Sequence, residues 1–126
     1  MKKAVKTAGA PSPIGPYNQA VAAGDLIFVS GQIPVDPSTG ELILDDIPRA
    51  TQSVLKAIEN ILQAAGSSKE KILKATIFLR DMNDFSMVNA EYARFFEGTV
   101  FPARETVQVA RLPKDVPLEI SVIALK

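Results

Sequence analysis

Two charged residues near the C-terminus, Arg104 and Glu119, lie on segments that alternate like β-strands. Alternation sends Arg104 and Thr106 to the same side of one strand, and it sends Glu119 to the side opposite the apolar residues of the last strand. A guanidinium can hold a carboxylate through two parallel hydrogen bonds, which lysine reproduces less well. The pair therefore indicates either a carboxylate-binding site or a salt bridge at a surface or an interface.

Four further residues are candidates that each have a structural alternative. Tyr17 leaves a proline-rich loop, where it either packs on the prolines or contacts a ligand. Ser30 and Gly31 end a strand, and a glycine there is typical of a turn as well as of a binding site. Asn89 comes one helical turn after Phe85 and off the apolar stripe, a position that usually faces solvent. The residues by themselves leave these alternatives open.

The chain contains no cysteine and no histidine. Their absence excludes disulfides, thiolate ligands and every catalytic arrangement that needs a cysteine nucleophile or a histidine base. A transition-metal site would have to be built from carboxylates alone, so we expect no metal.

Length and composition predict one globular domain over residues 1–126, because 47% of the residues are apolar and 22% are charged. Fourteen basic and fourteen acidic residues cancel, which argues against nucleic acid or an anionic membrane as a partner. The N-terminal segment lacks the apolar stretch of a signal peptide, and no segment has a membrane-spanning length. These observations predict a cytoplasmic protein.

Periodicity predicts six strands and two helices. The strands are expected near residues 3–7, 19–23, 26–30, 72–80, 103–112 and 118–125. The first helix should follow Asp45 or Asp46 and end at Gly66. The second should be capped by Asn83 or Asp84, end at Gly98, and carry an apolar stripe. That stripe consists of Phe85, Val88, Tyr92, Phe95 and Phe96, and the strand before it should place Leu73, Ala75, Ile77 and Leu79 on one face.

This order of elements predicts an α+β fold, with two helices packed on one face of a mixed β-sheet. The other face has no helix to cover it, although Phe28, Phe78 and Val107 lie on its strands. We expect this face to be buried against other copies of the chain, the alternative being a face exposed to water.

Five segments together resemble the RidA/YjgF family of reactive intermediate deaminases over nearly the whole chain. They are APSPIGPYNQA, FVSGQIPVDPSTGE, the AAG that closes the first helix, KATIFLRDMNDFSMVNAEYARFF and FPARETVQVARLPKDVPLEI. A single block such as PAR would be a weak signal, but five in this order are highly specific.

The resemblance implies a chorismate-mutase-like α+β fold, assembled as a homotrimer with three clefts between its subunits. By position it assigns the arginine that grips the substrate carboxylate to Arg104, the acidic residue that orients or activates water to Glu119, and the loop tyrosine to Tyr17. A second group should line the same cleft: Ser30, Gly31, Asn89 and the backbone around Thr106.

The implied activity is the hydrolysis of reactive 2-imino acids, such as 2-iminopropanoate and 2-iminobutanoate, to 2-keto acids and ammonia without a cofactor. A trimer of the same family that binds a small carboxylate and regulates a partner without catalysis is the alternative. Ribonuclease activity is a weaker one, because a histidine acid/base pair and a net basic charge are both missing. Chorismate mutase activity would rest on fold analogy alone.

Three positions depart from the family's pattern. Thr106 stands where many members have a cysteine, which removes any role for a reactive thiol there. Ser121 replaces a common acidic residue, and Pro117 occupies the start of the last strand. The departures concern substrate preference and trimer contacts rather than the reaction type.

Overall fold

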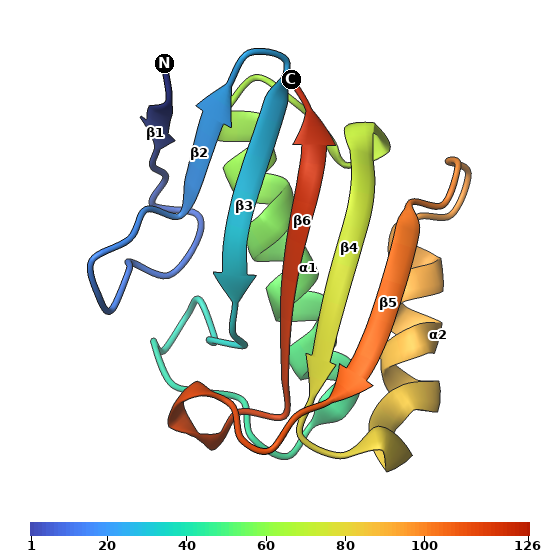
Figure 1. The fold of residues 1–126 in the computed structure, drawn as a ribbon. Helices are drawn as coiled ribbons and strands as arrows, with labels where there is room; N and C mark the ends of the chain where they lie inside the picture. Colours follow the sequence, from blue (N-terminus) through green and yellow to red (C-terminus); the bar gives the residue numbers. More distant parts are fainter.

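The computed structural model describes residues 1–126 and contains one six-stranded mixed sheet with two helices on one face (Figure 1). The α+β prediction is confirmed. The strands are β1 (Lys3–Val5), β2 (Ala20–Ala23), β3 (Leu26–Gln32), β4 (Ile72–Leu79), β5 (Ala103–Gln108) and β6 (Leu118–Leu125). The helices are α1 (Ile47–Ala64) and α2 (Phe85–Phe95), with short 3-10 turns η1 (Lys69–Lys71), η2 (Met82–Asp84) and η3 (Pro113–Asp115).

The strand order is β1-β2-β3-β6-β4-β5, so the C-terminal strand lies in the middle of the sheet. All neighbouring strands are antiparallel except β4 and β5, which are parallel. A parallel pair needs a long crossover, and α2 supplies it here. As a result, β5 becomes the edge strand beside the helix that precedes it.

Helix α1 begins where the sequence indicates. The Asp46 side chain accepts a hydrogen bond from the Arg49 backbone N–H at 3.1 Å, and Pro48 occupies the first turn, where its missing N–H costs nothing. Gly66 follows the helix with φ of 78°, a conformation that glycine adopts without a Cβ penalty. The predicted caps therefore hold at both ends.

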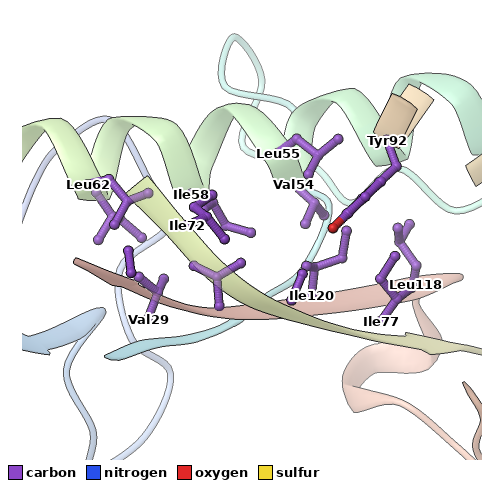
Figure 2. Close-up of a cluster of buried hydrophobic side chains, with 14 of the residues drawn as sticks. Val29, Val54, Leu55, Ile58, Leu62, Ile72, Ile77, Tyr92, Leu118 and Ile120 are labelled. Atoms are coloured by element: carbon purple, nitrogen blue, oxygen red, sulfur yellow. The ribbon is translucent and has the colours of Figure 1, made fainter. Parts of the chain in front are cut away.

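The core lies between the two helices and the sheet, as Figure 2 shows. Every second residue of the central strand β6 is buried toward α1, beginning at Leu118. The α1 stripe that covers these residues includes Val54, Ile58 and Ile61, each of them fully buried. Burial of this apolar surface stabilises the fold and fixes which face of every strand points toward solvent.

The opposite face of the sheet carries no helix (Figure 1). Phe28 and Val107 are 45% and 42% exposed on it. Phe78 lies beside Val107 on β5 and beside Glu119 on β6, which places the three side chains on this open face. Neither helix combines the length and apolar character that a membrane crossing requires.

Three details differ from the sequence predictions. Leu73 is 44% exposed instead of buried, because the β4–β6 register shifts between Ile72 and Lys74 and Ile72 takes the core position. The fifth strand ends at Gln108, not at residue 112. The cap before α2 is also different, since the Asp81 carboxylate accepts from the Asn83 N–H and caps η2, and the Asp84 side chain makes no capping bond.

Candidate functional site

Arg104 lies on the edge strand β5, and its side chain is held by three residues of α2. Its Nη1 donates to Asn89 Oδ1 at 2.8 Å. Its guanidinium carbon lies 4.8 Å from the centre of the Tyr92 ring and 5.6 Å from the centre of the Phe85 ring. Both distances lie within the range of cation–π attraction. The structure thus brings Arg104 and Asn89 together, as two of the predicted site residues.

A surface pocket opens beside this guanidinium. Its walls are formed by Asn89, Tyr92, Ala93, Phe101, Pro102 and Arg104. None of the ion pairs within the chain includes Arg104. A cation at the rim of a partly apolar pocket, without an internal counter-ion, is suited to bind an anion such as a carboxylate.

Thr106 lies two residues further along β5, on the same face as Arg104. Its hydroxyl oxygen is buried and has no hydrogen-bond partner within the chain, and the same holds for the hydroxyl of Tyr92. Burial raises the pKa of the Tyr92 phenol, and the charge of Arg104 opposes that rise. The phenol therefore stays neutral beside the guanidinium at physiological pH.

Glu119 lies on β6, where it points to the open face of the sheet. Its pKa is raised because burial disfavours the charged carboxylate, and it forms no ion pair within the chain. Its side chain extends across the backbone of Gly31, so closely that a Cβ on Gly31 would lie 2.5 Å from Glu119 Cδ. A half-buried carboxylate with a raised pKa is suited to accept a proton near neutral pH.

Gly31 lies against this carboxylate, Ser30 precedes Gly31 in the chain, and Tyr17 shares a cleft with Gly31. Ser30 and Gly31 lie where the β3–β6 register shifts between Val29 and Gln32, a bulge that re-aims the strand end. The Ser30 hydroxyl donates to the Asn18 carbonyl at 2.6 Å. Tyr17 is 45% exposed and lines a narrow cleft together with Gly31. Ser30 thus anchors the loop to β3 and leaves Tyr17 accessible.

Sequence reasoning missed Gln19, which holds the loop that carries Tyr17. Its Oε1 accepts from the Thr7 N–H at 2.8 Å, and its Nε2 lies 3.0–3.2 Å from the carbonyl oxygens of Thr7, Ala10 and Pro11. Its side chain is buried, and a buried glutamine just before a strand gives no signal in the sequence.

The predicted site residues form two groups on opposite faces of the sheet. Arg104 pairs with Ala75 on the helix-covered face, whereas Glu119 pairs with Phe78 on the open face. Strand β4 lies between β5 and β6, so the two side chains do not meet within one chain. The first group contains Arg104, Asn89 and Thr106. The second is Glu119 with Gly31, and Ser30 and Tyr17 lie next to Gly31 in the chain and in a shared cleft, respectively.

No group of three or more histidine, cysteine, aspartate or glutamate side chains lies close enough together to hold a metal ion. Fold and site together define a small α+β protein in which an arginine without an ion-pair partner lines a surface pocket and a glutamate is half-buried.

Comparisons with known proteins identify the family to which this α+β protein belongs. The sequence profile of the endoribonuclease L-PSP family matches residues 7–126. A RutC family protein of Pyrococcus horikoshii is 52% identical over 100% of this chain and 99% of its own length. The 2-iminobutanoate/2-iminopropanoate deaminase of Escherichia coli K12 is 49% identical over 100% of this chain and 99% of its own length. The chain therefore belongs to the RidA/YjgF family.

A solved structure agrees with this assignment. The crystal structure of E. coli TdcF with bound serine has a TM-score of 0.94 and 46% sequence identity to this chain, and the match covers 98% of both chains. The mixed sheet with two helices is thus shared with an experimental structure of the family.

Proposed function

We propose that this chain is a homotrimeric, cofactor-free deaminase of the cytoplasm that hydrolyses 2-iminopropanoate and 2-iminobutanoate to 2-keto acids and ammonia. Removal of such reactive imines and their enamine tautomers would limit metabolite damage. The observation that carries the proposal is the Arg104 guanidinium, which lines a surface pocket and has no carboxylate partner within the chain. A 2-imino acid offers that guanidinium a carboxylate next to the reacting carbon.

The reaction needs one positioned water and one proton acceptor. Glu119 would take a proton from water as the water oxygen bonds to the imine carbon, and would pass this proton to the imine nitrogen as the C=N π bond opens. In the resulting carbinolamine, Glu119 would move the hydroxyl proton to the amino nitrogen, so the C–N bond breaks, ammonia leaves and the oxygen becomes the keto group. The raised pKa of Glu119 supports this role, because it brings the base closer to neutral pH.

Arg104 and Glu119 would meet between subunits. They lie on opposite faces of the sheet of one chain, so a site containing both must combine the Arg104 of one copy with the Glu119 of its neighbour. The exposed Phe28 and Val107 favour burial of the open face in such an assembly. Tyr17, Ser30 and Gly31 would then complete the Glu119 side of the cleft, and Asn89 and Thr106 the Arg104 side.

Imine hydrolysis tests the proposal directly. An amino acid oxidase converts alanine or 2-aminobutanoate to the imine in the cuvette, and ammonia release is measured with and without the chain. We expect acceleration above the spontaneous rate. Arg104→Lys should weaken both turnover and binding of 2-oxobutanoate by about 10- to 100-fold, because the bidentate fork is lost. The control Arg111→Lys changes an exposed arginine that is paired with Asp115 and should have little effect.

A regulatory trimer that binds a small carboxylate without catalysis is the second candidate. The serine bound to E. coli TdcF, a relative of this chain, favours binding of small carboxylates as a function in its own right. A binder would hold 2-oxobutanoate without increasing the rate of ammonia release. That single combination of results would replace the deaminase proposal.

The name of the matched family suggests RNA cleavage as a third activity. The chain has no net positive charge and no histidine, which leaves little to collect phosphates or to transfer protons at a ribose. We therefore do not favour this activity. Incubation with single-stranded RNA should give no cleavage above a buffer control.

A further inference from the structure

The way in which α2 holds Arg104 differs from the way in which the other arginines are held. Arg49, Arg94 and Arg111 each pair with a carboxylate, and Arg80 donates to backbone carbonyl oxygens. Arg104 contacts an amide oxygen and two aromatic rings, all of them neutral. Its position is thus fixed without a partner that cancels its charge.

The three contacts come from one face of α2. Phe85, Asn89 and Tyr92 follow one another at spacings of four and three residues, which places them on the same side of a helix. Tyr92 is also packed in the core, with its ring 4.8 Å from that of Phe96. The tyrosine ring is therefore buried and packed, and Figure 2 shows its hydroxyl end directed into the buried cluster near Val54.

Aromatic rings attract a guanidinium through their faces and accept no strong hydrogen bond from its N–H groups. Asn89 Oδ1 accepts a hydrogen bond from one of the five N–H groups of Arg104. The remaining N–H groups stay available for a carboxylate. Arg111 shows the contrast, because its Nε and Nη2 donate to the two oxygens of Asp115 at 2.7 and 3.2 Å and its fork is occupied.

We propose that Phe85 and Tyr92 are positioning residues that fix the orientation of the Arg104 guanidinium while leaving its charge and its hydrogen-bonding fork free for the substrate carboxylate. This proposal rests on the proposed function for the identity of the carboxylate. An arginine oriented in advance loses less side-chain freedom on binding, so the rings should strengthen substrate capture more than they change the chemical step. They touch Arg104, and they need not touch the substrate.

The test combines an NMR signal of the arginine with ligand binding. The Nε–Hε signal of Arg104 is assigned by its absence in Arg104→Lys. Phe85→Leu removes a ring from beside the guanidinium, so this signal should shift, and the dissociation constant of 2-oxobutanoate should rise about 3- to 10-fold. In imine hydrolysis KM should rise by a similar factor with kcat changed less than about 2-fold.

Matched variants separate positioning from general packing. Phe85→Tyr restores an aromatic face and should restore both the signal and the binding. Phe95→Leu removes a partly buried ring of the same helix that packs near Lys69 instead of Arg104, so it should leave the Arg104 signal unchanged. If Phe85→Leu fails to fold, Phe85→Met keeps most of the volume without a ring.

Two results would overturn the proposal. One is an unchanged Arg104 signal and unchanged 2-oxobutanoate affinity in a folded Phe85→Leu or Phe85→Met variant. The other is a loss of 2-oxobutanoate affinity in Phe95→Leu as large as that in Phe85→Leu, which would indicate a general effect of helix packing. Failure of the proposed function can be distinguished from failure of this proposal. In that case the wild-type chain would neither accelerate imine hydrolysis nor bind 2-oxobutanoate. The Arg104 signal would still report whether the rings hold the guanidinium.

Discussion

The carboxylate of Glu119 lies over the α-carbon of Gly31, where a side chain would otherwise be. A Cβ on Gly31 would lie 2.5 Å from Glu119 Cδ and 2.9 Å from Cγ, with Oε2 closer still. Real Cβ atoms do not approach other heavy atoms so closely, so glycine at this position is a condition for the observed placement of Glu119. The β3 bulge and the β6 strand thus build the carboxylate side of the candidate site together.

Gly31→Ala should displace Glu119 without disturbing Arg104. We expect a loss of about 1–3 kcal/mol in stability from overpacking and a fall in imine turnover of about 10-fold or more, with 2-oxobutanoate binding largely retained. In a Glu119→Ala background the contacting atoms are gone, so the same substitution should cost almost nothing. Equal stability losses in both backgrounds, measured by urea denaturation, would refute the steric coupling.

The pH dependence of turnover should follow the ionisation of Glu119. Its pKa is raised by burial, so the carboxylate becomes a competent base only at a pH above the ordinary glutamate range. The ratio of wild-type to Glu119→Gln turnover should therefore grow as pH rises through the raised pKa and reach about 100-fold at its plateau. Taking the ratio removes the pH dependence of the imine itself. A ratio that stays constant with pH would exclude Glu119 as the base.

The same raised pKa predicts the direction of a stability effect. Because folding favours the protonated form, the contribution of Glu119 to stability is present below its ordinary pKa and is lost as pH rises through the raised value. Glu119→Gln should consequently gain stability relative to the wild type between acidic and neutral pH. Urea denaturation midpoints of both proteins over this range check the sign.

Mixed assemblies should show whether the site lies between subunits. Co-expression of Arg104→Lys with Glu119→Gln at equal levels gives mixed trimers in which one cleft combines an intact Arg104 with an intact Glu119. Random mixing places about a quarter of all clefts in this state, so about a quarter of wild-type turnover should return. Activity no higher than the average of the two variants, in assemblies that light scattering identifies as mixed trimers, would place both residues of each site in one subunit.

Chelation should leave activity unchanged. The chain offers no cluster of side chains that could hold a metal, and the proposed reaction uses water and a carboxylate base. Turnover after incubation with excess EDTA should match that of an untreated sample. Loss of turnover that added metal restores would contradict this expectation.

Gln19 should contribute to stability through the loop that it holds. Gln19→Ala removes a buried side chain that lies within hydrogen-bond distance of four backbone atoms of the loop, and it should cost about 2–3 kcal/mol. Gln63→Ala changes an exposed glutamine of α1 and serves as the control, with an expected change under about 0.5 kcal/mol. Equal denaturation midpoints for the two variants would contradict the role of Gln19.

The sequence by itself determined the α+β class, the two helices and the face on which most strand residues lie, Leu73 being an exception. Period-two alternation placed Glu119 opposite Leu118 and Ile120, and the structure agrees, because a buried apolar face fixes the register of a strand. Asp46 caps the start of α1 and Gly66 follows its end, as predicted from the residue types that favour helix ends. These features depend on near neighbours in the chain, which a sequence displays directly.

Only the tertiary structure decided how the candidate site is divided. Strand β6 inserts between β3 and β4, a long-range pairing that no local pattern specifies, and this insertion separates Arg104 from Glu119. The contacts of Phe85 and Tyr92 with Arg104 arise because the parallel crossover returns β5 to the side of α2. In the sequence these rings are indistinguishable from the rest of an apolar stripe, since periodicity reports burial and does not report which charged group lies beside a ring.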